Sequence, residues 1–327
     1  MEKIIYNDLL FIHGILPYIE PQLFRIYELK SVSKRFNVLI PNCKHKSKYI
    51  KVPSQKYKTL KDAYYYVKDL LYYNISRRIL INPPEIWLDE GHYGNLIGTI
   101  SYPIVIRGMG INRTILTRGL HFHICENWYR GINYLKVIID SLSINHNINS
   151  TNPNLWFHGI YGDSDKFINI LSCKIEKCNG NGICGNRLRV NIKNSIICDN
   201  KKSGIHVWHD STLLADDLEI FNCSSGITIG NLSTKKNIIL NDIKIHHNDK
   251  DGLSVGGWDP LAKVIVKGNK SDISYNNLIV KHKYVYGVST DYSGKLIFKG
   301  LDKNVSHDNY NDQNINSRHN SEIIFIC

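Results

Sequence analysis

Two stretches of the sequence combine aromatic, imidazole and carboxylate side chains at short spacing. They read Gly204-Ile-His206-Val-Trp208-His209-Asp210 and Gly252-Leu-Ser254-Val-Gly-Gly-Trp258-Asp259. If the aliphatic residues that follow each glycine point into a core, His206 and Trp208 point outward, because side chains alternate along a strand. An outward indole beside polar groups suits stacking on a sugar ring, whereas the alternative is a tryptophan packed beneath a loop. The pattern therefore predicts a ligand-binding face that contains His206, Trp208, His209, Asp210, Trp258 and Asp259.

Candidate catalytic groups are few. Asp216-Asp217 lies between apolar pairs of a strand, and Asp249 with Asp251 lies in a turn-like stretch. A glycosidase needs two carboxyl groups about 5–10 Å apart. No acid stands in register with Asp210 in the next copy of the pattern, at Gly226-Ile-Thr228-Ile-Gly230-Asn231. We therefore predict binding without cleavage and assign no catalytic residue, with a carbohydrate-active enzyme as the alternative.

The eight cysteines include no C-x-x-C pair. Cys173, Cys178 and Cys184 are five and six residues apart, which fits no common zinc arrangement. The sequence thus predicts buried thiols, and we expect neither a metal ion nor a cofactor.

The elements that would position the predicted face come from a repeat. A glycine followed by an aliphatic residue recurs at Gly159, Gly182, Gly204, Gly226 and Gly252, at spacings of 23, 22, 22 and 26 residues. Asn200, Asn222 and Asn248 precede the last three glycines by four residues, and Cys178 takes that place one repeat earlier. Units this short must stack and share one core, and their short strands without intervening helices indicate a parallel β-helix. The asparagines should bond to their neighbours in adjacent coils, and the glycines should lie at tight corners in one column.

Other segments fit around this repeat. An amphipathic helix over 59–73, with Thr59 as its N-cap, should cover the N-terminal end of the β-helix. The polar stretch 302–321 reads as a loop, and the last residues, EIIFIC, read as a last strand or a plug. We therefore predict a helical segment over 1–40, a basic linker over 41–56 and the β-helix over 57–327. An ordinary surface loop of the large domain is the alternative for the basic stretch.

The net charge of +12 reflects a lysine-rich composition, and we do not expect a nucleic-acid partner. No stretch approaches the roughly 20 apolar residues of a membrane span, and the N-terminus lacks a cleavage site for a signal peptide. The sequence therefore predicts a cytoplasmic protein without a membrane partner.

Residues 57–119 resemble the opening of pectate-lyase-like (pectin-lyase-like) proteins. The resemblance rests on an aromatic residue, a T-[IL]-x-x-A helix, an I-x-[IL]-x-P strand and an [IV]-x-I-x-G-x-G…T-I turn. The matching residues are Tyr57, Thr59, Leu60, Ala63, Ile79, Ile81, Pro83, Ile104, Ile106, Gly108, Gly110, Thr114 and Ile115. The resemblance implies a right-handed parallel β-helix over about four-fifths of the chain. It does not settle activity, since this fold hosts lyases, hydrolases and binding proteins.

Residues 9–40 resemble an F-box, although the usual leading Leu-Pro is replaced by Tyr6-Asn7. The matching residues are Leu9, Leu10, Leu16, Pro17, Leu23, Leu29, Val32, Ser33, Lys34 and Phe36. The resemblance implies that residues 8–40 dock on a Skp1-like subunit of a ubiquitin ligase through Leu9, Leu16, Pro17 and Leu29. The β-helix would then recruit a glycan or protein cargo, in a domain order similar to adaptors of amoeba-infecting giant DNA viruses. The alternative is that these helices only cap the β-helix.

Overall fold

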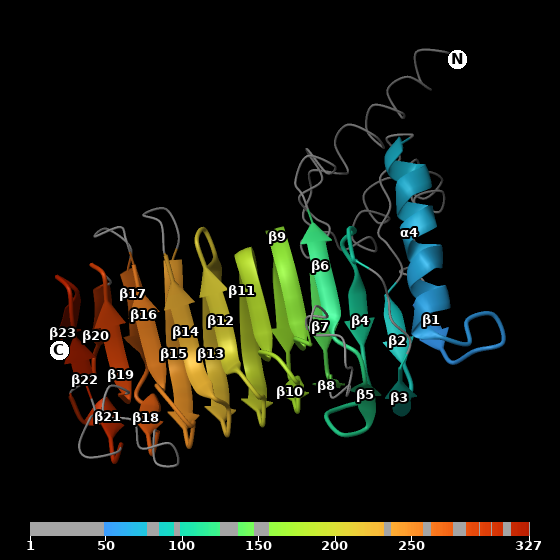
Figure 1. Ribbon diagram of the computed structural model, residues 1–327. Coiled ribbons are helices and arrows are strands. Elements are labelled where there is room, and N and C mark those ends of the chain that lie inside the picture. The colour runs from blue at the N-terminus through green and yellow to red at the C-terminus, as the bar shows by residue number, and fades with distance from the viewer. Residues whose placement is uncertain are drawn as a thin grey trace, which may run out of the picture.

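The described strands form one continuous parallel sheet wound into a β-helix with three faces (Figure 1). The structure is a computed structural model. It describes residues 49–76, 85–94, 99–124, 137–146, 157–231, 237–257, 263–276, 286–293, 295–301, 303–309 and 315–326. The F-box-like segment therefore lies outside the described residues, as do Ile79, Ile81 and Pro83.

Each face consists of strands that pair in parallel from one coil to the next. The first face contains β6 (Leu120–Ile124), the start of β9 (Ile160–Leu171), the start of β11 (Ile183–Cys198), β12 (Ser203–Trp208), β14 (Ser225–Gly230), β16 (Leu253–Gly256), β19 (Val288–Asp291) and β22 (Ile315–Ser317). The second face contains β1 (Ile50–Val52), β2 (Ile86–Leu88), β4 (Val105–Arg107), β7 (Val137–Asp140), later parts of β9 and β11, the starts of β13 (Thr212–Phe221) and β15 (Asn237–His246), β17 (Lys263–Lys267), β20 (Lys295–Lys299) and β23 (Glu322–Ile326). The third face contains β3 (Gly91–Tyr93), β5 (Thr114–Leu116), β8 (Ser143–Asn145), β10 (Lys174–Glu176), the ends of β11, β13 and β15, β18 (Asp272–Ser274) and β21 (Ser306–His307).

Aliphatic ladders fill the interior. On the first face, the inward residue that follows each repeat glycine aligns with its counterpart in the next coil. The ladder runs through Ile160, Ile183, Ile205, Ile227, Leu253 and Val288, all of them fully buried. Alternation along each strand then turns the next side chain outward, which creates the surface of the first face.

The repeat glycines form one column, as the sequence predicts, but for a different reason. Ile160, Ile227 and Leu253 donate their N–H groups to the carbonyls of Gly182, Gly252 and Gly287 in the next coil. The column glycines do not have the left-handed conformation of a tight turn. A Cβ on Gly226 would instead lie 2.3 Å from the Gly252 carbonyl oxygen and 2.4 Å from Cγ2 of Ile245. Close packing between coils, and not a corner, requires glycine here.

The asparagine ladder is also present, with one correction. Its buried members are Cys178, Asn200, Cys223, Asn248, Asn276 and Asn309. Asn222 is exposed, because it occupies the left-handed corner position (φ 52°) and bonds to Asp199. Cys223 takes the inward place and receives a bond from the Asn200 amide at 3.6 Å. The prediction placed Asn222 one residue out of register.

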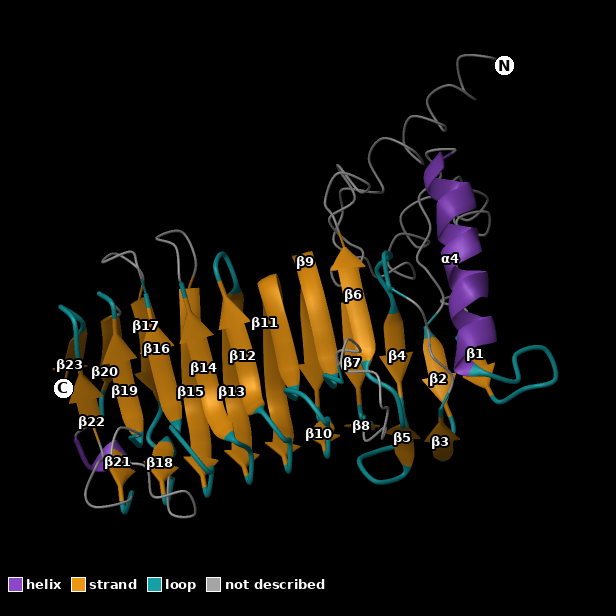
Figure 2. Cartoon of the chain, viewed as in Figure 1, coloured by secondary structure: helices purple, strands orange, loops and turns teal. Residues whose placement is uncertain are grey.

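The N-terminal end of the stack is covered by α4 (Leu60–Ser76), which lies beside β1 and β2 (Figure 2). Thr59 is its N-cap: the Asp62 N–H donates to the Thr59 hydroxyl, and the Thr59 N–H donates to the Asp62 carboxylate. Strand β1 comes from the stretch expected to be a linker, but it pairs with β2 and buries Ile50 and Val52. Residues 50–52 thus belong to the first coil of the β-helix.

At the C-terminal end of the stack, the prediction of a loop over 302–321 is wrong in part. It contains the short 3₁₀ helix η4 (Lys303–Val305) and strands β21 and β22, which extend the first and third faces. The EIIFIC stretch contains β23, as predicted. In the described part of the chain, no helix is long and apolar enough to cross a membrane.

Candidate functional site

His206 and Trp208 lie side by side on the outer surface of β12. Ile205 and Val207 are fully buried, so alternation turns the imidazole and the indole outward. The two rings are half-buried, and their centroids are 4.8 Å apart. This orientation agrees with the sequence prediction.

The residues after β12 form the corner between the first and second faces. His209 is exposed in a left-handed conformation (φ 52°), and its N–H donates to the Gly230 carbonyl. The buried Ser211 hydroxyl donates to the Trp208 carbonyl at 2.7 Å and so fixes the end of the strand. His209 and half-buried Asp210 therefore lie at the rim of this face. Trp258 and Asp259 fall outside the described residues.

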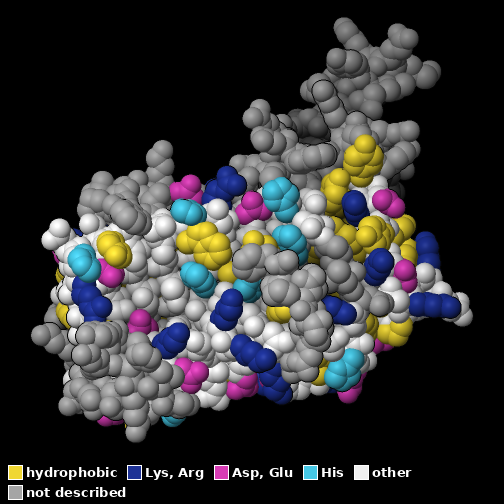
Figure 3. Space-filling model, in the orientation of Figure 1, with side chains coloured by type: hydrophobic (Ala, Val, Ile, Leu, Met, Phe, Trp, Pro, Cys, Tyr) yellow, Lys and Arg dark blue, Asp and Glu magenta, His cyan; other side chains and the backbone are white. Residues whose placement is uncertain are grey.

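The register adds residues that the sequence prediction did not include. One outward row consists of His121, Tyr161, Cys184 and His206, from four successive coils. Beside it, His123 pairs in register with Asp163, and Asn186 pairs with Trp208. Figure 3 shows histidine and hydrophobic side chains gathered on this face over the strands from β6 to β12.

Direct contacts link these side chains. His123 Nδ1 lies 2.6 Å from Asp163 Oδ1, and an Arg187 nitrogen lies 3.7 Å from the other oxygen of this carboxylate. The Tyr161 ring lies between two imidazoles, with centroid distances of 5.0 Å to His121 and 5.3 Å to His158. The result is a surface of aromatic and imidazole rings in contact with one another, bordered by one paired carboxylate.

Burial controls the protonation of this cluster. It lowers the pKa of His121 and of His206, and Lys202 contributes to the lowering at His206. It also raises the pKa of Tyr161, and that of the Cys184 thiol to about 11. Near neutral pH these imidazoles are therefore uncharged. They can exchange hydrogen bonds with hydroxyl groups and accept a proton.

His158 should make the stability of the fold depend on pH. Its Nδ1 accepts the Asn181 N–H at 2.9 Å, and burial, with Lys202, lowers its pKa to about 4. Between the unfolded pKa near 6.5 and pH 4, only the unfolded chain binds this proton, so stability falls as the pH falls. The loss should reach roughly 2–3 kcal/mol. Denaturant unfolding at several pH values should show a shallower dependence for His158→Asn, which keeps an acceptor but cannot titrate. Identical pH profiles for the two proteins would contradict this assignment.

A simple signal in the sequence could have found the additional row. Tyr161, Cys184 and His206 each stand two residues after a repeat glycine, so the alternation used for His206 applies to all of them. His121 has the same offset from Gly119, which lies outside the 22-residue repeat. Asp163 contacts His123 because parallel pairing aligns two strands about 40 residues apart in the sequence. It contacts Arg187 from a strand about 23 residues further along. That alignment requires knowledge of the coil lengths.

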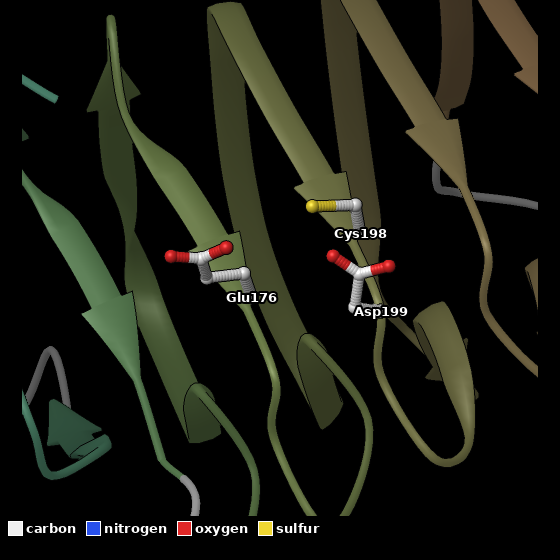
Figure 4. A group of neighbouring side chains, drawn as sticks. All are labelled: Glu176, Cys198 and Asp199. Carbon is white, nitrogen blue, oxygen red and sulfur yellow. The ribbon is translucent and has the colours of Figure 1, made fainter. Parts of the chain in front are cut away.

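Glu176, Cys198 and Asp199 form a separate group on the third face, with ligand-type atoms within 4.8 Å of one another (Figure 4). Metal binding would require the thiolate of Cys198. Burial, assisted by a hydrogen bond to Asp199, raises the pKa of this thiol and keeps it protonated. The Glu176 carboxylate is already bound by Lys174 at 2.8 Å. The group therefore fits a local hydrogen-bonded network better than a metal site.

Comparison with known families agrees with the fold. The sequence model of the family described as "Right handed beta helix region" matches residues 133–300, just over half of the chain. The chain belongs to this right-handed β-helix family. The A-module of mannuronan C-5 epimerase AlgE4 from Azotobacter vinelandii has a similar structure, with 12% sequence identity and a TM-score of 0.38. The match covers 85% of this chain and 96% of that module. No curated protein sequence matches the chain significantly.

Proposed function

We propose that this β-helix protein is a non-catalytic interaction protein that binds a glycan on its first face. The observation that carries the proposal is that the strand register aligns Tyr161 with His206, two coils apart with Cys184 between them, and places Trp208 beside His206 on the same outer surface. From β6 to β12 this surface extends over three strand spacings, or about 14 Å. Aromatic rings can stack on the apolar faces of sugars, while the imidazoles exchange hydrogen bonds with hydroxyl groups.

The carboxylates on this surface favour binding over hydrolysis. Asp163 is the carboxylate among the outward residues that the register aligns from β6 to β12 in the described strands, and it is paired with His123 and Arg187. A glycosidase requires a proton-donating carboxyl group and a second carboxyl about 5–10 Å away. The other outward residues aligned with it in the described strands include no second carboxyl group, so the pair that hydrolysis needs is missing from these positions.

A second candidate function is a polysaccharide lyase, which the position of Tyr161 between His121 and His158 favours. A neutral imidazole could remove the proton on the carbon next to a uronate carboxylate, with Arg187 offsetting the charge. The bond to the leaving sugar oxygen would then break, the Tyr161 phenol would protonate that oxygen, and a double bond would remain in the ring. This chemistry needs no carboxylate pair.

One experiment separates the two candidates. The full chain is titrated with oligosaccharides of β-1,4-linked glucan, β-1,4-linked mannan and α-1,4-linked galacturonan, and the same mixtures are assayed for new reducing ends and for the ultraviolet absorbance of unsaturated sugars. The proposal requires saturable binding without either product. An unsaturated product that Tyr161→Phe abolishes would establish the lyase instead, and the absence of any binding would argue against a glycan as the ligand.

For the N-terminal segment we propose the F-box role implied by its sequence, which would make the chain an adaptor of a ubiquitin ligase. The full chain should bind a Skp1-like protein, and Leu16→Asp should weaken this binding by roughly tenfold or more, because it places a charge in an apolar interface. Tyr72→Ser is a suitable control, since Tyr72 is exposed on α4 outside the F-box-like segment. Equal binding by Leu16→Asp and the native chain, measured by calorimetry, would leave the capping role as the better explanation.

A further inference from the structure

In the two coils that follow Trp208, the outward positions of the first face carry glycine or small side chains. Trp208 pairs in register with Gly230, and Gly256 in the next coil pairs with Asp291. The parallel row holds Thr228 and Ser254. A Cβ on Gly230 would lie 3.7 Å from the Trp208 Cβ, and one on Gly256 would lie 3.7 Å from the Ile229 carbonyl oxygen. Both are ordinary contact distances, so packing does not require glycine at either position, in contrast to the column glycines.

A second aromatic group lies at the C-terminal end of these rows, one coil beyond Gly256. Tyr292 follows Asp291, is 50% exposed, and stacks on His319 with a centroid distance of 5.1 Å and an interplanar angle of 9°. His319 Nδ1 lies 2.5 Å from Asp291 Oδ1, and the Tyr292 N–H donates to the same oxygen at 2.9 Å. The corner is tied to both neighbouring coils, because Gly257 donates to the Asp291 carbonyl and Ser293 donates to the His319 carbonyl. The exposed ring is therefore held in place before any ligand arrives.

The two aromatic groups share one face at a defined distance. The row from Trp208 through Gly230 and Gly256 to Asp291 crosses three strand spacings, about 14 Å. Figure 3 shows this face, with a smaller group of hydrophobic, acidic and histidine side chains toward the C-terminal coils. Other stacked rings, such as His247 on Tyr275, belong to the corner next to the third face and do not share this row.

We propose that Tyr292, His319 and Asp291 form a second sugar-binding subsite, and that the ligand is a linear oligosaccharide that lies along the helix axis. The chain of sugars would stack on Trp208 at one end and on Tyr292 at the other, and would cross the floor formed by Gly230, Gly256 and Ser254. A separation of about 14 Å corresponds to roughly three sugar units, so a ligand of about four units or more would reach both rings. This inference rests on the proposed function, because it extends the same face.

Calorimetric titration of the full chain with di- and hexasaccharides of β-1,4-linked glucose, β-1,4-linked mannose and α-1,4-linked galacturonate tests the inference. For the series that binds, the hexasaccharide should bind about tenfold more tightly than the disaccharide, since it occupies both subsites. Tyr292→Ala should remove most of this gain and leave the affinity for the disaccharide unchanged. Trp208→Ala should weaken the binding of both lengths. His319→Ala, which removes the ring beneath Tyr292, should lower the hexasaccharide affinity alone.

Tyr275→Ala is the matched control, since Tyr275 is an exposed tyrosine that also stacks on a histidine but lies elsewhere. It should not change either affinity. Equal affinities for the two lengths, or a hexasaccharide affinity that Trp208→Ala lowers and Tyr292→Ala does not, would overturn the second subsite and leave the proposed function standing. If neither length of any series binds the native chain, the proposed function and the inference fall together.

Discussion

Gly226→Ala should destabilise the β-helix by about 2–3 kcal/mol, whereas Gly230→Ala should change its stability by less than about 1 kcal/mol. The two glycines lie four residues apart on β14. A Cβ on Gly226 would collide with the Gly252 carbonyl of the next coil and with Ile245 in the core, so the coils would have to separate. A Cβ on Gly230 meets only the Trp208 Cβ at 3.7 Å.

Urea-induced unfolding followed by circular dichroism measures both free energies. Each substitution adds one methyl group to the same strand, so Gly230→Ala controls for the intrinsic effect of replacing glycine. Equal stabilities of the two variants would mean that close packing between coils does not account for the glycine column.

Trp208→Ala should weaken glycan binding by about 1–2 kcal/mol, or roughly 5–30-fold, without loss of stability. The indole lies on the outer surface of β12 between buried Val207 and the corner at His209, so its removal leaves the aliphatic ladder intact. Titration with the oligosaccharide that the native chain binds gives the affinity, and a thermal melt gives the stability.

Trp87→Ala serves as the control, because Trp87 is 41% exposed on β2 of the second face. It should retain the native affinity. Unfolding of Trp208→Ala would instead show that this indole is part of the core, and an unchanged affinity would remove it from the binding face.

The local pattern of the sequence was sufficient to predict the architecture. The glycine spacing predicted the column, and Thr59 with the apolar stripe behind it predicted the helix that covers the first coils. Strict alternation predicted that His206 and Trp208 face outward. These features depend on neighbours within a few residues or on a constant period, and both can be read from one chain.

The errors arose where a coil departs from the constant period. Asn222 appeared to continue the ladder, but the corner between the third and first faces is one residue shorter in its coil than in the preceding one. Cys198 pairs with Phe221 and Ser203 pairs with Ser225, so Cys223 takes the inward place. Pairing of His123 with Asp163 spans 40 residues and depends on the length of that coil. The burial of each histidine also decides whether its imidazole stays neutral, and the composition of the chain does not reveal which histidines are buried. The roles of residues 8–40, Trp258 and Asp259 remain predictions.

The most direct test of the central claim is hydroxyl-radical footprinting of the full chain, with and without saturating oligosaccharide. We predict that Tyr161, His206 and Trp208 become protected, because the ligand covers the first face. Phe221, His246 and Tyr275, which surround the corner next to the third face, should react equally in both samples. Protection of this second group with no change at Tyr161, His206 and Trp208 would contradict the assignment of the first face as the binding surface.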